Sequence, residues 1–348
     1  MDFVSSLGGG DGLRVEEALG EGFVRLRISE AERRQAKHDI RCVEDAVIEL
    51  LRNARDADAA HVFVATSAVG NVRDLLVFDD GCGIPQGMQT RVFEARVTSK
   101  LDSMHMDQWG VHGRGMALYS IRENAQQARV IASGRGLGSA FGVTFDTNAI
   151  TERADQSTWP TVVSQDGGQT LRGPHNIIRT CVEFGLASRD RCKVYVGSPS
   201  EVVATMRARM QPAALLHGAA AATDLAGVPV AQRVCFAHDA RALREVADAL
   251  GIKMSERTAH RIIRNEIKPL QNVCATVMPS GNPQRVAAPA GGMRKVVLAD
   301  SDRREFARLM ARDFSFLGDR YYLELLGEPR VRLSEGRLTV TFDYADED

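Results

Sequence analysis

The sequence predicts an α+β fold in which a helix packs over a β-sheet, because helix-type and strand-type apolar patterns follow each other. In residues 43–54 apolar side chains recur at steps of three and four, which is typical of a helix with one buried face. Strand patterns rich in β-branched and aromatic residues lie on both sides of it, at 23–28, 61–66, 75–78, 129–132 and 141–145. Ser29 and Glu32 predict a capped helix start between the first strand and this helix.

The composition is that of an ordinary globular protein. The chain has 348 residues, enough for about two to three domains, and its net charge of −1 predicts no strongly basic or acidic partner surface. Its six cysteines include no Cys-x-x-Cys pair, so neither a disulfide framework nor a zinc site is indicated. Because no leader pattern and no bilayer-length apolar run is found, we expect a cytoplasmic protein without membrane contact.

The predicted helix carries a polar side that a buried helix does not need. Glu49, Asn53 and Asp56 stand at positions i, i+4 and i+7, so their side chains point to the same side. The alternative is a helix whose polar face is simply solvated.

Two glycine-rich clusters follow. Asp79-Asp80-Gly81-Cys82-Gly83-Ile84 comes directly after a strand, where glycines allow a flat ligand close to the backbone and a carboxylate can accept from an amine. In residues 110–121 a glycine-rich stretch is followed by the apolar periodicity of a helix, and the N–H groups at the N-terminus of that helix could bind phosphate. An ordinary turn is the alternative for the first of these two clusters.

In this order, the three clusters resemble the superfamily of ATPases that contains gyrase, heat-shock chaperones, histidine kinases and MutL (GHKL), and its Bergerat ATP-binding fold. The resemblance is strongest to MutL and to the B subunit of topoisomerase VI. Residues 49–59 match the pattern Glu-Leu-x-x-Asn-x-x-Asp-Ala-Gly-Ala except for Asp58 in place of glycine, and Thr98-Ser99-Lys100 matches the entry of the lid. Gly138-Ser139 replaces the Gly-Thr of many members and keeps the hydroxyl group.

The resemblance implies roles for individual residues. Glu49 would activate the attacking water, Asn53 would hold the Mg²⁺ that bridges the phosphates, and Asp79 would bind the adenine amine above Gly83. Residues 98–109 would form the lid. The complete set of implied nucleotide-binding residues is Asn53, Asp56, Asp79, Gly81, Gly83, Ile84, Thr98, Ser99, Lys100, Gly110, Gly113, Arg114, Gly115, Met116 and Ser139.

Two functions are compatible with these motifs. One is a Mg²⁺-dependent ATPase that acts as an ATP-gated switch, forms a homodimer when ATP is bound, and is coupled to DNA or to a DNA-acting partner. The other is a regulator of a protein partner, resembling histidine kinases or chaperones, that binds ATP or ADP without appreciable hydrolysis. The presence of Glu49 favours hydrolysis.

We expect five segments: an N-terminal arm and strand (1–28), the ATP-binding domain (29–150), a linker and the start of a transducer-like α+β domain (151–228), a helical segment (229–275), and a C-terminal α+β part that ends in a hairpin (276–348). The helical segment has helix-turn-helix spacing at 241–265, with plain helix packing as the alternative. The resemblance also implies a transducer lysine that reaches the phosphates, and Lys193, Lys253, Lys268 and Lys295 are the candidates.

Overall fold

The computed structural model describes residues 15–99, 105–107, 110–112, 115–153, 155–165, 168–212, 225–278, 300–321, 323–334 and 337–346. The chain divides into two compact units, Met1–Ser280 and Gly281–Asp348. All residues predicted for the nucleotide site belong to the first unit.

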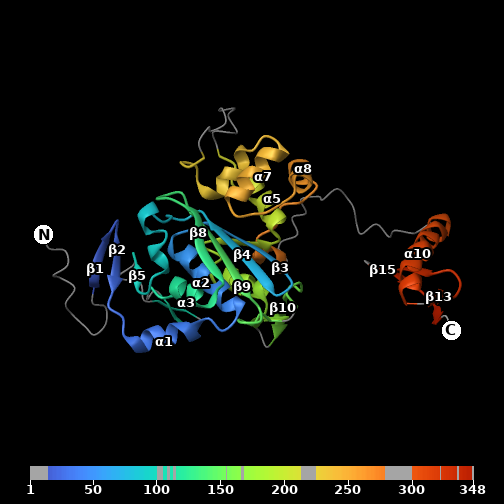
Figure 1. The fold of residues 1–348 in the computed structure, drawn as a ribbon, viewed down its shortest axis with the longest axis horizontal. Helices are drawn as coiled ribbons and strands as arrows, with labels where there is room; N and C mark the ends of the chain where they lie inside the picture. The colour runs from blue at the N-terminus through green and yellow to red at the C-terminus, as the bar shows by residue number, and fades with distance from the viewer. Residues whose placement is uncertain are drawn as a thin grey trace. The chain divides into compact units, whose positions relative to one another are not determined.

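A five-stranded sheet with the order β12-β3-β4-β9-β8 forms the centre of the first unit (Figure 1). Its strands are β3 (His61–Val69), β4 (Val72–Asp79), β8 (Gln127–Ser133), β9 (Ser139–Asp146) and β12 (Lys193–Gly197). Strands β3, β4, β9 and β8 pair antiparallel, whereas β12 runs parallel to β3 with Val194 opposite Val62. Residues 62–65 are buried in succession, which indicates that β3 is covered on both faces.

Three helices cover one face of this sheet: α2 (Val43–Asp56), α3 (Ala117–Asn124) and α4 (Ile177–Ala187). The apolar stripe of α2 includes Val47 and Leu51, which are buried in one core with Val64 and Val77 of the sheet. Figure 1 shows α2 and α3 on this side. The predicted α+β fold with a helix over a sheet is thereby confirmed.

The opposite face is covered by α5 (Pro199–Arg209), the 3-10 helix η4 (Val230–Phe236), α7 (Ala240–Ala249) and α8 (Glu256–Ile263) (Figure 1). Phe63 and Phe78 of the sheet share a buried cluster with Leu243 of α7 and Ile262 of α8. The two helices with helix-turn-helix spacing therefore use their apolar sides to pack within this unit, and the exposed side of α8 carries Arg257, His260, Arg261 and Arg264.

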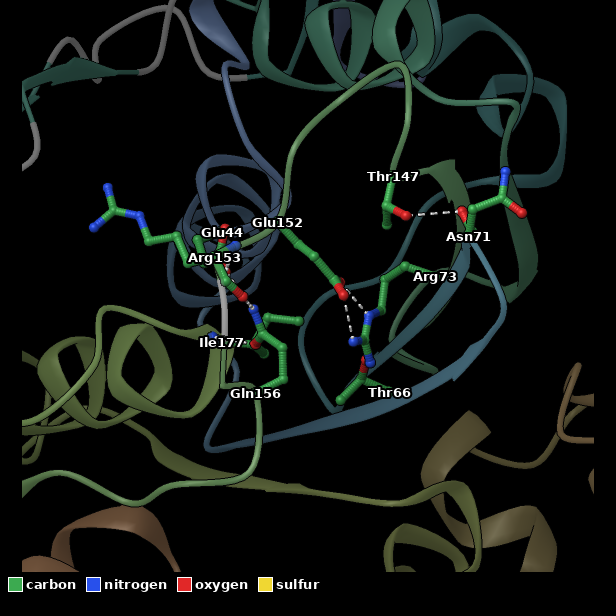
Figure 2. A network of polar contacts seen from close by, with 9 residues as sticks. All are labelled: Glu44, Thr66, Asn71, Arg73, Thr147, Glu152, Arg153, Gln156 and Ile177. Carbon is green, nitrogen blue, oxygen red and sulfur yellow. Dashed lines mark hydrogen bonds and ion pairs between the residues drawn. The ribbon is translucent and has the colours of Figure 1, made fainter. Parts of the chain in front are cut away.

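The segment between β9 and α4 is fastened to the sheet and to α2 by polar contacts (Figure 2). Two of the three guanidinium nitrogens of Arg73, Nε and Nη2, donate to the Glu152 carboxylate at 2.7 and 3.0 Å. Gln156 Nε2 donates to Glu44 of α2 at 2.7 Å, and the Gln156 amide oxygen accepts from Ile177 N at the start of α4. Between these anchors and α4 lies a hairpin, β10 (Thr161–Gln165) and β11 (Gly168–Arg172). Because β12 then joins the central sheet, we propose that the folded ATP-binding domain continues past residue 150.

A second, smaller sheet consists of β1 (Val15–Gly20) and β2 (Phe23–Leu26), which precede the helices, and β5 (Val97–Thr98), which follows α2. Helix α1 (Glu30–Asp39) follows β2, and the Ser29 side chain and the Glu32 carboxylate form a capping box at its start. Short elements complete the unit: η2 (Gln86–Met88), η3 (Arg91–Phe93), β6 (His105–Asp107), β7 (Gly110–His112) and α9 (Val273–Val277).

The described part of the second unit contains the long helix α10 (Asp300–Tyr321) and two antiparallel strand pairs. Strand β13 (Leu323–Leu325) pairs with β16 (Tyr344–Asp346), and β14 (Arg330–Ser334) pairs with β15 (Arg337–Thr341). Phe314 of the helix stacks on Phe342, with ring centroids 5.1 Å apart. Across the described parts of both units, no helix combines the length and apolar character needed to span a bilayer.

Candidate functional site

A cavity of about 530 Å³ lies between α1, α2, the turn after β4, strand β5 and the start of α3. Most of the predicted site residues line it: Glu49, Asn53, Asp56, Asp79, Gly83, Ile84, Thr98, Ser99, Gly115, Met116 and Ser139. Gly81 lies in the turn behind Asp79, and Gly110 lies in β7 and does not line the cavity. Lys100, Gly113 and Arg114 fall outside the described residues.

Helix α2 supplies one wall because its apolar stripe faces the sheet and leaves Glu49, Asn53 and Asp56 on the cavity side. Arg52 also lines the cavity, with its side chain only 4% exposed. The Arg52 Nη1 atom donates to Glu49 Oε1 at 2.5 Å. The carboxylate expected to orient water is therefore held by a guanidinium group three residues further along the same helix.

Several buried polar atoms at this cavity have no hydrogen-bond partner. Among the described residues such atoms are Asn53 Nδ2, Arg96 Nε, Ser120 Oγ and Glu44 Oε2, and the first three belong to residues that line the cavity. A buried polar group without a partner is costly, and natural proteins rarely retain one. These groups fit a polar ligand, and the Asn53 amide, whose oxygen and nitrogen can exchange places by rotation, fits a metal bound to phosphates.

The turn after β4 places a buried carboxylate at the inner end of the cavity. Asp79 is 2% exposed and lies opposite Ser139 of β9, which is 3% exposed. The Asp79 Oδ1 atom accepts from Gly81 N at 2.9 Å. Gly83 has a φ of +69°, and a Cβ atom there would stand 1.9 Å from the carbonyl oxygen of Gly134, so only glycine fits.

Ser133 at the end of β8 joins this turn to the β8–β9 hairpin. Its Oγ atom accepts from Ile84 N at 2.7 Å, donates to Gly138 O at 2.9 Å and lies 3.0 Å from Ser139 Oγ. Ser133 thereby fixes the two cavity residues Ile84 and Ser139 relative to each other.

Asp80 anchors the turn to His61 at the start of β3. Its carboxylate accepts from the backbone N of His61 at 2.7 Å and lies 2.8 Å from the His61 ring Nδ1. Burial raises the pKa of the Asp80 carboxyl, but the hydrogen bonds from the side chain and backbone of His61 outweigh it, so that the pKa lies below its ordinary value.

The start of α3 forms a further part of the cavity wall. Gly115 has a φ of +67°, and a Cβ atom there would stand 3.1 Å from Val97 O, so this loop lies tightly against β5. The backbone N of Arg96 donates to Gly115 O at 2.9 Å. Met116 and Ala117 then begin α3 at the cavity wall.

Some lining residues were not predicted from the sequence: Glu32, Gln35 and Asp39 of α1, Arg52, Arg96 and Ser120. The capping box at Ser29 indicated that α1 exists, but not which side of it would face a ligand. Of the candidate transducer lysines, Lys193, Lys253 and Lys268 are exposed and none of them lines the cavity, whereas Lys295 falls outside the described residues.

Comparison with known proteins agrees with this geometry. Residues 40–167 match the family described as histidine kinase-, DNA gyrase B- and HSP90-like ATPases. The sequence of this segment is therefore similar to ATPase domains of the GHKL type, and both α2 and the Asp79 turn lie inside it.

Two curated proteins give a closer partial match. Over 97 residues the chain is 40% identical to the DNA mismatch repair protein MutL from each of two strains of Thermus thermophilus. The match covers 27% of this chain and 17% of each relative. The similarity to MutL is thus confined to part of the chain and a small part of the relatives.

Proposed function

We propose that this protein binds Mg²⁺-ATP in the cavity between α2 and the Asp79 turn and hydrolyses it. One observation supports the proposal most strongly: Glu49 and Asn53, one helical turn apart, line the same cavity as the buried pair of Asp79 and Ser139. The cavity lining thus contains one carboxylate that can bind an amine and another that can orient water, and an oriented water is one requirement of phosphoryl transfer to water.

Different residues of the cavity would bind the adenine, the attacking water, the Mg²⁺ ion and the phosphates. Asp79 would accept a hydrogen bond from the exocyclic amine of adenine, with Gly83 leaving room for the flat base. Glu49 would orient the attacking water, and Asn53 would hold Mg²⁺ together with the phosphates. Bound Mg²⁺ neutralises charge on the phosphate oxygens. Gly115 and the first N–H groups of α3 would face the phosphates.

A second function, nucleotide binding without appreciable hydrolysis, is favoured by the contact between Arg52 and Glu49. A carboxylate oxygen that accepts from a guanidinium group at 2.5 Å offers less capacity to accept a proton from water. In that case the nucleotide would set the conformation recognised by a protein partner.

The two functions are separated by measuring ATP turnover and ATP binding on the same variant. We expect Glu49→Gln to bind ATP with affinity close to that of the unchanged protein and to hydrolyse it about 10²–10⁴-fold more slowly. Glu245→Gln, on the exposed side of α7, is the matched control and should keep the full rate. If the unchanged protein binds ATP but it and both Glu→Gln variants show only background turnover, the binding-only function is the correct one.

We further propose that ATP brings two copies of the chain together and that this switch is coupled to DNA or to a DNA-acting protein. The similarity to a DNA mismatch repair protein supports the second part. In this proposal the subunits would exchange residues 1–28, and the protein would be located in the cytoplasm.

A further inference from the structure

We propose that Arg96 is a phosphate-binding residue of the nucleotide cavity and that it joins the phosphates to helix α1 through Glu32. This inference rests on the proposed binding of ATP and adds to it a residue to which neither the sequence motifs nor the relatives assign a role.

The backbone of Arg96 is fixed between two segments, strand β2 and the loop at Gly115. Arg96 N donates to Gly115 O at 2.9 Å, and Leu26 N of β2 donates to Arg96 O at 3.0 Å. Its φ of +62° is unusual for a residue with a side chain and is retained because both neighbours hold it. Arg96 therefore stands directly beside the loop expected to hold the phosphates.

The side chain of Arg96 is buried and only partly satisfied. The residue is 6% exposed and lines the cavity. Its Nη2 atom is paired with Glu32 Oε1, whereas its Nε atom is buried without a hydrogen-bond partner. A cationic N–H group that has lost its water and has no acceptor is expected to bind an anion.

Charge at the cavity favours the same assignment. Of the described lining residues, the acidic ones are Glu32, Asp39, Glu49, Asp56 and Asp79, and the basic ones are Arg52 and Arg96. Arg52 is already paired with Glu49. A triphosphate brings several further negative charges, so it needs cations, and the guanidinium group of Arg96 can bind phosphate oxygens while it keeps Glu32.

Glu32 links this contact to α1. The hydrogen bond from the backbone of Ser29 lowers the pKa of the Glu32 carboxyl, burial opposes it, and the Ser29 hydroxyl and Arg96 lower it further. The same carboxylate completes the capping box at the start of α1. A phosphate bound to Arg96 is thus connected through two side chains to the first turn of that helix.

The test compares ligands that differ only in their phosphates. Binding of adenosine, ADP and a non-hydrolysable ATP analogue, each with Mg²⁺, is measured by calorimetry on the full chain and on Arg96→Met, which keeps the apolar stem. We expect the analogue and ADP to bind about 10- to 100-fold more weakly, while adenosine binds as before. Arg96→Lys, which retains a charge, should lose less.

The control is Arg91→Met, because Arg91 precedes β5 like Arg96 but pairs with Glu17 and Glu94 and does not line the cavity. Equal loss of affinity for all three ligands, or no loss in Arg96→Met and Arg96→Lys, would overturn the inference and leave Arg96 as a structural clamp. If Arg96→Met does not fold, the affinities of Arg96→Lys for adenosine, ADP and the ATP analogue decide the question in the same way. If the unchanged protein binds none of the ligands, the proposed function itself fails.

Discussion

Gly138 and Asp79 approach each other so closely that a Cβ atom on Gly138 would stand 2.1 Å from the Asp79 carbonyl oxygen. This approach locks the β8–β9 hairpin onto the turn that carries the buried carboxylate. The hairpin also offers a matched comparison, since Gly136 has the same φ of +71° but meets nothing within 4 Å.

We therefore expect Gly138→Ala to lower both stability and ATP affinity, and Gly136→Ala to lower stability less and to leave ATP affinity unchanged. Both substitutions carry the strain of a positive φ, about 1–2 kcal/mol, but only Gly138→Ala also forces backbone atoms apart. Urea denaturation and calorimetry on the two variants make the comparison. Equal behaviour of the two would contradict the close approach.

Asp80 should make stability depend on pH. Because its pKa is lowered in the folded state, its carboxylate adds stability above the unfolded pKa, and this stability is lost as the pH falls through the folded pKa. The difference in free energy of unfolding between the unchanged protein and Asp80→Asn should thus be largest near neutral pH and shrink below about pH 4. Denaturation curves at a series of pH values test this. A difference that grows towards acid pH would show that the interaction with His61 does not favour the charged carboxylate.

The nucleotide should control association. We expect a non-hydrolysable ATP analogue to shift the chain towards a dimer, ADP to leave it monomeric, and deletion of residues 2–12 to weaken the shift. A ligand can move this equilibrium only by its preference for the dimeric form, so the size of the shift measures that preference. Sedimentation velocity at micromolar protein gives the result, and an unchanged monomer in the analogue would argue against the ATP-gated switch.

The polar side of α2 was predictable because helical periodicity is a local property. The spacing of Glu49, Asn53 and Asp56 fixes their common side before any tertiary contact forms. The turn at Asp79 was equally predictable, since glycines directly after a strand favour a turn there whatever the tertiary contacts are. In both cases the structure brings the predicted residues to one cavity.

Contacts that depend on tertiary structure were not predictable. Ser133 meets Ile84 only because of the register of the β8–β9 hairpin, and neither sequence neighbourhood is unusual. Likewise β12 pairs with β3 in parallel, a choice that its apolar pattern leaves open. Arg96 lies between the apolar residues Ala95 and Val97, but Glu94 and Lys100 are close to it in the sequence, so no local pattern marked it as a cavity residue.

The proposed nucleotide site depends on binding of adenine by Asp79, and calorimetric titration of Asp79→Asn with Mg²⁺-ATP tests this interaction most directly. If the amide oxygen keeps the hydrogen bond from Gly81 N, the amide nitrogen is left facing the adenine amine, so we expect a loss of about 1–3 kcal/mol, or about 5- to 150-fold in affinity. Asp74→Asn, on an exposed position of the same strand, should bind as the unchanged protein does. ATP affinity in Asp79→Asn equal to that of the unchanged protein would contradict the nucleotide site described for this cavity.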